Sequence, residues 1–251
     1  MTVSQLKSEL RKVANAEKAK ILARFFKTGK GEYGEGDRFL GVVVPAQRKI
    51  AKQYFPTRGF SSVRSTLLAV GELLQSEFHE ERLTALLILI ERYRRSDDRD
   101  RQLLFRFYLK HLSRINNWDL VDLSAPNIVG DYLLAQDPSL LFRLAKSKNM
   151  WTRRVAMLAT FAFIKNGRFA ETLALAELLL IKEKEAQDLM HKAVGWMLRE
   201  VGKRDQRVLE EFLGHSATHL PRTALRYAIE KFPEAKRQKY LALGRASKGT
   251  R

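Results

Sequence analysis

The stretch HKAVGW at residues 191–196 recurs in outline along the chain. Each copy places basic residues just before a short run of small and apolar side chains, as at the start of an amphipathic helix. The other copies are ERLTAL at 81–86, RRVAML at 153–158 and PRTALR at 221–226. With WDLV at 118–121 filling the longest gap, the steps run from about thirty to about thirty-seven residues, the range of paired-helix repeats. We therefore predict an all-α solenoid of stacked helix pairs.

Helical periodicity also covers most of the sequence between these copies. The six prolines fall near the expected helix ends. Stacked helix pairs form a superhelix whose inner helices line a concave face, and the recurrent basic segments would make that face basic. We expect one repeat domain over residues 1–240 and a flexible basic tail at 241–251. A compact irregular helical bundle is the alternative that the sequence leaves open.

One glycine-rich segment interrupts the helical pattern. It reads TGKGEYGEGDRFLG at residues 28–41 and is followed by VVVP at 42–45. This composition predicts a short hairpin or loop near residues 28–44. The segment lacks the phosphate-loop pattern, and its acidic residues do not have the spacing of a calcium loop. We expect a structured turn whose basic residues lie near a DNA backbone: Lys27, Lys30 and Arg38.

The charge of the chain favours a polyanionic partner. Forty-six Lys and Arg residues face twenty-eight Asp and Glu residues, giving a net charge of +18 and a pI near 10.2. The basic residues are spread along the sequence, which indicates a folded basic surface rather than a basic tail. Release of condensed counterions would supply much of the affinity for a nucleic acid.

Several function classes lack support in the sequence. The chain has no cysteine, so disulfides, thiolate catalysis and cysteine-based zinc sites are absent. Only His215 and His219 share a helical spacing, and no HExxH pattern accompanies them, so we expect no metal site. The N-terminus has no apolar signal core, and the apolar run from Leu83 to Ile90 is too short to span a bilayer. We expect a cytoplasmic protein with no membrane association.

The three tryptophans lie beside charged residues at helical spacing. Trp118 and Asp122 are four residues apart, so on a helix they share one face, one turn apart. A DNA-binding groove gives little reason to hold a carboxylate unless the carboxylate does chemistry. The structural alternative is a core tryptophan, with Asp122 capping a neighbouring helix. Trp151 is expected to be such a core residue.

At these residues the chain resembles the AlkD-like family of DNA alkylation repair proteins. The stretches that carry the resemblance are NNWDLVD at 116–122, NMWTRRVAML at 149–158 and KAVGWMLREVGK at 192–203. Upstream, ARFFK at 23–27 and FLGVVVPAQRK at 39–49 are also similar to the family, and the resemblance extends to about residue 235.

The resemblance implies HEAT-like repeats and an enzyme that needs no cofactor: a DNA glycosylase that hydrolyses the N-glycosidic bond of cationic N3- and N7-alkylpurines without base flipping. It implies catalytic roles for Asp122, Trp118 and Trp196. Phe25 stands where the family usually has a tyrosine. The expected DNA-binding residues are Arg154, Arg48, Phe25, Lys192, Arg199 and Lys203.

The glycine-rich segment departs from this family pattern. Founding-type members are shorter here, whereas some non-catalytic relatives carry a hairpin in this region and prefer branched DNA. The alternative function is therefore a non-catalytic HEAT-like protein that binds branched or distorted DNA. A protein-interaction solenoid is a third option. We expect a monomer that binds duplex DNA, alkylated or branched.

Overall fold

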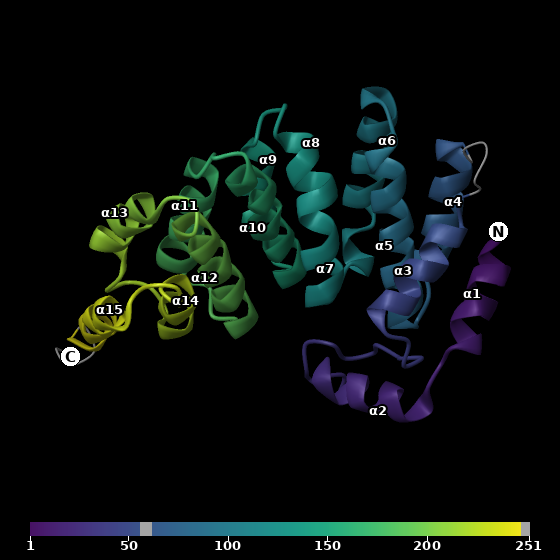
Figure 1. The fold of residues 1–251 in the computed structure, drawn as a ribbon, viewed down its shortest axis with the longest axis horizontal. Helices are drawn as coiled ribbons and strands as arrows, with labels where there is room; N and C mark the ends of the chain where they lie inside the picture. The colour runs from purple at the N-terminus through teal and green to yellow at the C-terminus, as the bar shows by residue number, and fades with distance from the viewer. Residues whose placement is uncertain (56–61, 247–251) are drawn as a thin grey trace. The chain divides into compact units, whose positions relative to one another are not determined.

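The computed structural model describes residues 1–55 and 62–246, and these residues are mostly helical. No strand occurs among them; Arg38 and Phe78 form an isolated bridge. The all-α prediction is confirmed. The chain divides into two compact units, Met1–Ser124 (unit 1) and Ala125–Arg251 (unit 2) (Figure 1).

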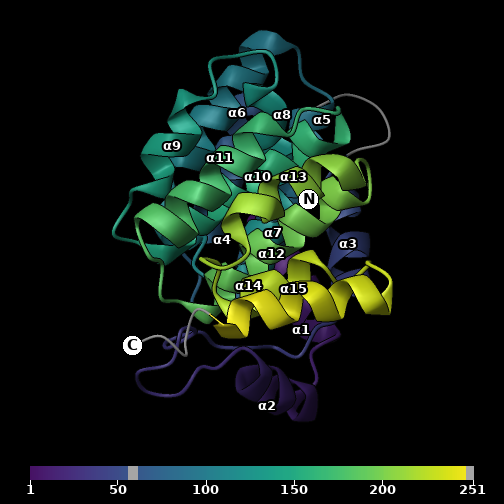
Figure 2. The ribbon, with the colours of Figure 1, turned by 90° about the vertical axis from the view of Figure 1, so that its left-hand side faces the viewer.

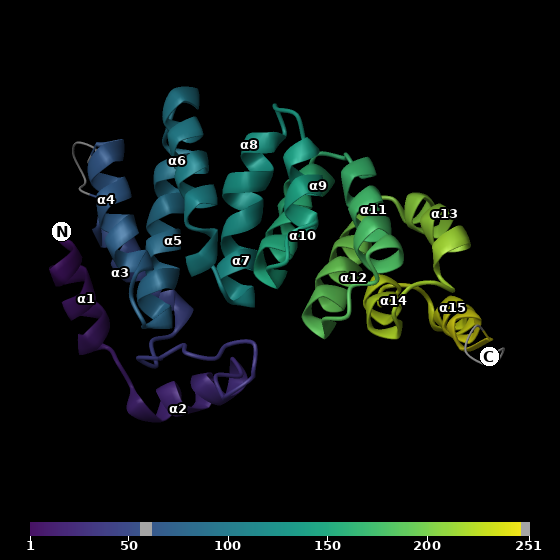
Figure 3. The same cartoon turned by 180° about the vertical axis from the view of Figure 1, so that it is seen from behind.

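Unit 1 is built from helices in two layers. Its elements are α1 (Val3–Lys12), α2 (Ala16–Phe25), α3 (Val44–Gln53), α4 (Val63–Leu74), α5 (His79–Arg94), α6 (Asp98–Lys110), the short η1 (Leu112–Arg114) and α7 (Trp118–Ala125). Helix α3 packs beside α5, α4 packs beside α6, and α5 contacts both α4 and α6. Figures 1 and 3 show α2 lying across the ends of α3 and α5.

Helix α5 forms the centre of unit 1. Its side chains from His79 to Ile90 are buried, and the run from Leu83 to Ile90 is almost entirely apolar, as expected for a helix that is covered on all sides. Within residues 1–55 and 62–246, the helices are all too short or too polar to cross a membrane.

The glycine-rich segment is a loop and not a hairpin. Two of its backbone N–H groups donate to carboxylates: Gly29 to Glu32 and Gly31 to Glu35, both at 2.8 Å. Others donate to nearby backbone carbonyl oxygens in turns, as Gly34 does to Lys27 at 2.9 Å. At its end, buried Glu80 of α5 accepts from the backbone N–H groups of Leu40, Gly41 and Val42 at 2.9, 2.8 and 3.1 Å.

Gly41 is required at the end of this loop for two reasons. Its φ is +80°, a left-handed conformation that favours glycine. A Cβ atom at this position would also lie 2.0 Å from the carbonyl oxygen of Asn15. The close approach allows the backbone N–H of Asn15 to donate to Leu40 at 2.9 Å, which ties the loop to the start of α2.

Unit 2 continues the helical pattern. Its elements are η2 (Pro126–Gly130), α8 (Asp131–Leu133), α9 (Ser139–Ala145), α10 (Met150–Lys165), α11 (Ala170–Glu177), η3 (Leu178–Lys182), α12 (Asp188–Gly202), α13 (Gln206–Ser216), α14 (Arg222–Ala228) and α15 (Glu234–Ala246). Helices α10, α12 and α14 pack in succession, and α9, α11 and α13 each pack against members of that row (Figures 1 and 2). This succession agrees with the predicted helical-repeat solenoid.

Part of the predicted C-terminal tail is helical. Helix α15 continues to Ala246, so residues 241–246 are ordered as a helix. Residues 247–251 lie outside the described residues. The single repeat domain over residues 1–240 and its basic concave face stay predictions.

We expect Gly195→Ala to destabilise unit 2 by about 1–3 kcal/mol, because the site has no room for a methyl group. A Cβ atom at Gly195 would lie 2.5 Å from the carbonyl oxygen of Ala224 and 2.6 Å from Cβ of Tyr227. Urea unfolding measures the loss. Gly214→Ala on α13 is the control, since its added Cβ meets nothing within 4 Å, and it should be neutral or stabilising by up to about 1 kcal/mol. Equal unfolding free energies for the two variants would contradict the close packing of α12 and α14.

Candidate functional site

Helix α7 presents Trp118 and Asp122 on neighbouring turns of one face, and both side chains are partly exposed. Asn117 fixes the start of the helix. Its Oδ1 accepts from the backbone N–H of Trp118 at 2.8 Å, while its buried Nδ2 donates to Asp37 at 3.2 Å. The site helix is therefore tied directly to the glycine-rich loop.

Trp118 is braced by aromatic rings from α2 and the loop. The ring of Phe26 stacks on Trp118 with centroids 5.0 Å apart and an interplanar angle of 9°. Phe26 also contacts Phe39 at 5.1 Å and His79 at 4.9 Å. Phe25 meets Trp118 edge-on at 5.8 Å and is 60% exposed. This stack limits the movement of the indole ring and leaves Phe25 accessible at its edge.

A buried polar network lies beneath the aromatic stack. His79 joins two carboxylates: Nδ1 lies 3.0 Å from Oδ2 of Asp37, and Nε2 lies 2.8 Å from Oδ2 of Asp119 on α7. The other oxygen of Asp37 accepts from Arg82 at 2.5 Å. The network therefore connects the loop, α5 and α7.

The two carboxylates keep His79 protonated. Burial alone would lower the pKa of His79, but the charge of Asp119 and the hydrogen bonds to Asp119 and Asp37 outweigh burial and raise it to about 9. Burial would conversely raise the pKa of Asp37, yet the hydrogen bond from His79 and the charge of Arg82 hold it below its usual value. At neutral pH the network thus consists of buried groups of opposite charge that stabilise one another.

Asp122 lies close to a buried tyrosine. Burial is the main cause that raises the pKa of Tyr108, and the charge of Asp122 raises it further. The hydroxyl group of Tyr108 forms a hydrogen bond of 2.8 Å with Ser124. The Asp122 side chain is neither fully buried nor fully exposed. It can therefore present a carboxylate to a ligand at the surface of α7.

Trp196 lies in the middle of α12 in unit 2. Its indole is partly exposed, lies 6.1 Å from the ring of Phe161, and donates from Nε1 to Glu200 at 3.3 Å. Lys203 and Arg204 pair with the same Glu200 at 2.6 and 3.2 Å. Burial acts to raise the pKa of Glu200, but these partners lower it below its usual value. The ring is thus held by a carboxylate that stays charged.

The basic residues near Trp151 point inward. Arg154 is only 5% exposed and donates to the carbonyl oxygen of Leu189 at 2.5 Å. Arg153 pairs with Glu185 at 2.5 Å. Trp151 is buried, as the core alternative expected. Little of the Arg154 side chain is left to reach a phosphate, and the predicted DNA contact of this residue stays a prediction.

The other predicted DNA-binding cations differ in their partners. Lys192 pairs with Asp188 at 2.7 Å, Arg199 pairs with Glu230, and Lys203 pairs with Glu200. Arg48 on α3 is exposed and has no ion-pair partner among residues 1–55 and 62–246. Lys192, Arg199 and Lys203 are thus paired with carboxylates, whereas Arg48 is exposed and unpaired within the described residues.

The structure brings together only some of the predicted site residues. Trp118, Asp122 and Phe25 lie at one place in unit 1, while Trp196, Lys192 and Arg199 lie on one helix of unit 2. The convergence of Asp122 with both tryptophans stays a prediction. Sequence reasoning missed the network of Asp37, His79 and Asp119. Its signal was the run of buried polar residues at the start of α5, HEER at 79–82.

The chain matches the model of a known protein family over most of its length. The family model for DNA alkylation repair enzyme matches residues 6–232. Among solved structures, a predicted DNA alkylation repair enzyme from Enterococcus faecalis aligns with a TM-score of 0.67 and 17% identity, covering 88% of this chain and 97% of that chain. A search of the curated proteins gives no match. The chain belongs to the DNA alkylation repair enzyme family, and the predicted family resemblance is confirmed.

Proposed function

We propose that the protein is a monofunctional DNA glycosylase that releases cationic N3- and N7-alkylpurines from duplex DNA without flipping the base. The observation that carries the proposal is the face of α7, where the partly exposed Asp122 lies one turn from Trp118. The indole is braced by Phe26, and the chain as a whole carries a net charge of +18. A carboxylate beside a fixed aromatic face suits a cationic transition state.

The proposed reaction uses the charge of the damaged base. When the N-glycosidic bond breaks, its electron pair leaves with the base and neutralises it, while positive charge develops on the deoxyribose. Asp122 stabilises that charge and orients a water molecule. Trp118 offers an electron-rich ring face to the same sugar. The catalytic role of Trp196 is proposed from the family resemblance. The water adds to the sugar and loses a proton, so the products are the free base and an abasic site.

The direct test uses a duplex that contains 7-methylguanine. The wild-type protein should release the free base and leave an abasic site, which heat or alkali converts into a strand break. Undamaged duplex is the control and should stay intact. If no base is released, while a four-way junction binds better than a linear duplex, the glycosylase proposal is wrong.

The proposed DNA surface uses Arg48, Phe25, Lys192, Arg199 and Lys203, together with Arg154. We expect Arg48→Gln to weaken binding equally for all duplex sequences and to reduce the salt slope of log Kd by about one. Anisotropy titrations over a range of salt concentrations measure both effects. Lys110→Gln is the control because this exposed residue ends α6, a helix that packs beside α4 and α5. Equal salt slopes for the two variants would show that Arg48 is not in the interface.

The glycine-rich loop supports the alternative function of a non-catalytic protein that binds branched or distorted DNA. Lys27 and Lys30 are exposed in this loop and have no ion-pair partner in the part of the chain that the structure describes. Two free cations on a structured loop are available to a second DNA segment. A clear preference for junctions that disappears in the double variant Lys27→Gln and Lys30→Gln would favour this alternative, and an unchanged preference would exclude the loop as its cause.

A further inference from the structure

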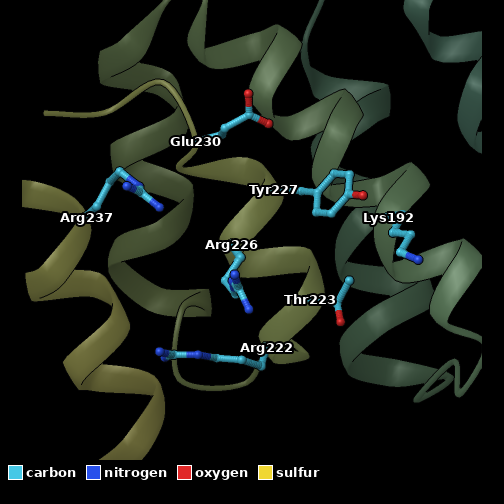
Figure 4. A pocket seen from close by; sticks show the side chains of 7 residues that line it. All are labelled: Lys192, Arg222, Thr223, Arg226, Tyr227, Glu230 and Arg237. Carbon is cyan, nitrogen blue, oxygen red and sulfur yellow. The ribbon is translucent and has the colours of Figure 1, made fainter. Parts of the chain in front are cut away.

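Unit 2 contains a basic pocket that the proposed chemistry does not use. The pocket has a volume of about 410 Å³ and is lined by residues of α12, α14 and α15 and by Glu230, just after α14 (Figure 4). Its cationic lining consists of Lys192, Arg222, Arg226 and Arg237. Thr223, Tyr227 and Glu230 complete the wall.

The net charge at the pocket is positive. Four cations line it, and two of them pair with carboxylates beside it, Lys192 with Asp188 and Arg237 with Glu234. The carboxylate in the lining, Glu230, pairs with Arg199 and, at 3.2 Å, with Lys231, so six cations stand against three carboxylates in all. Figure 4 shows the carboxylate of Glu230 pointing away from Arg222 and Arg226. Glu230 is part of the wall, so an anion would bind on the side of the pocket that Arg222 and Arg226 line.

Three of the cations are held in place by other groups. Arg222 donates to the carbonyl oxygen of Leu241 at 2.5 Å, Arg237 pairs with Glu234 at 2.5 Å, and Lys192 pairs with Asp188 at 2.7 Å. These contacts position side chains that keep further N–H donors. Guanidinium groups bind phosphate oxygens through two parallel hydrogen bonds, so such an arrangement is ready to receive a phosphate group.

Arg226 differs from the other three cations. It is exposed and forms no ion pair or side-chain hydrogen bond with residues 1–55 or 62–246. It lies on the pocket wall between the fixed arginines and Tyr227 (Figure 4). The guanidinium of Arg226 is thus free to close on an incoming anion.

The size and lining of the pocket indicate what kind of anion it takes. Its volume is within the range of small-molecule sites and is larger than a bare phosphate requires. Tyr227 adds a ring face, which suits the base of a nucleotide. The Thr223 hydroxyl donates to Asp188 at 3.0 Å, so its oxygen can still accept a hydrogen bond from a sugar hydroxyl. The pocket is partly open to solvent, so a group that projects from the DNA can enter it. A terminal phosphate monoester carries nearly two negative charges at neutral pH and gains more from a net positive site than a diester does.

The pocket is close to the proposed catalytic surface of unit 2. Lys192 and Trp196 are four residues apart on α12, so they lie on one face, separated by about 6 Å along the helix axis. A strand end held in the pocket would lie near Trp196.

We propose that this pocket binds the terminal phosphate monoester of a DNA strand, at its 5′ or its 3′ end. The proposal rests on the proposed function in that DNA is the ligand, and it adds recognition of a strand end. The protein would then bind damaged DNA more tightly where a phosphorylated end is present.

The test compares short undamaged duplexes that have 5′-phosphate, 3′-phosphate or only hydroxyl ends. We expect the wild-type protein to bind one of the phosphorylated duplexes more tightly than the hydroxyl-ended duplex, on the order of tenfold, by fluorescence anisotropy. Arg226→Gln should abolish this difference while leaving affinity for the hydroxyl-ended duplex unchanged. The substitution removes an exposed side chain without a partner among the described residues, so the fold should persist.

Arg207→Gln is the matched control, because Arg207 is an exposed cation on α13 outside the pocket. It should leave the preference for phosphate ends intact. Equal affinity of the wild-type protein for all three duplexes would overturn the proposal, and so would a preference that Arg226→Gln and Arg207→Gln reduce equally. Base release is measured separately on a covalently closed duplex that has no ends. If the wild-type protein releases no base from the closed duplex but still prefers phosphorylated ends, the glycosylase proposal is wrong and the proposal for the pocket is supported.

Discussion

Asp122→Asn should slow the release of 7-methylguanine from duplex DNA by on the order of a hundredfold or more. The substitution keeps the size of the side chain but removes the charge that faces the developing cation on the sugar. DNA binding should persist or become tighter, because a negative charge near the phosphates is lost. Single-turnover rates with saturating protein measure the chemical step, and anisotropy measures binding.

The matched control for this substitution is Asp98→Asn, which removes the same charge from an exposed position on α6. It should leave base release unchanged. If Asp122 has only a structural role, two different outcomes are expected for Asp122→Asn. The midpoint of thermal unfolding falls, and base release falls only in proportion to the folded fraction. A variant that is as stable as the wild type yet releases base at the wild-type rate would remove Asp122 from the mechanism.

The second large effect concerns the pH dependence of stability and the side chain of His79. Its pKa in the folded protein is about 9, against 6.5 for an ordinary histidine. The stabilising contribution of the protonated ring is therefore complete below pH 6.5 and is lost as the pH rises through about 9. A shift of this size corresponds to about 3 kcal/mol. Urea unfolding from pH 6 to pH 9.5 should show the free energy of unfolding of the wild type falling toward that of His79→Gln.

The relevant quantity is the difference between the wild type and His79→Gln at each pH, which removes the contribution of titratable groups outside the network. This difference should narrow by about 3 kcal/mol between pH 6.5 and pH 9. His219→Gln alters an exposed histidine outside the network. Its free energy of unfolding should differ from that of the wild type by an amount that does not change with pH. If the difference for His79→Gln is also flat, His79 is not charged in the folded protein.

The helices were predictable because their signals are local. Apolar residues that recur at three and four spacings identify α10 and α12 without reference to the rest of the chain. The polar network was not predictable, because its contacts join residues far apart in sequence. His79 reaches Asp37 across 42 positions and Asp119 across 40, and Asn117 reaches Asp37 across 80. No local pattern encodes such pairings.

The recurrent basic segments were only partly informative. A basic residue before a run of apolar residues marks the start of a repeat helix, and α10 and α12 contain RRVAML and HKAVGW as expected. The pattern does not tell whether the side chain points to solvent or turns inward. Arg154 turns inward because the carbonyl oxygen of Leu189, from the neighbouring helix, offers an acceptor within reach. The glycine-rich segment was expected as a hairpin or a loop, and the carboxylates of Glu32, Glu35 and Glu80 decide for the loop.

The link between the glycine-rich loop and α5 limits how this chain can change over evolutionary time. Deleting the loop would also delete Asp37 and leave Arg82 and His79 buried without one of their counter-charges. Insertion or loss of the loop should therefore occur together with changes at these two positions on α5. In relatives whose chain is shorter between α2 and α3, we expect uncharged side chains where this protein has His79 and Arg82. The length of the loop between α2 and α3 and the residues at positions 79 and 82, some forty positions away, would then change together among relatives.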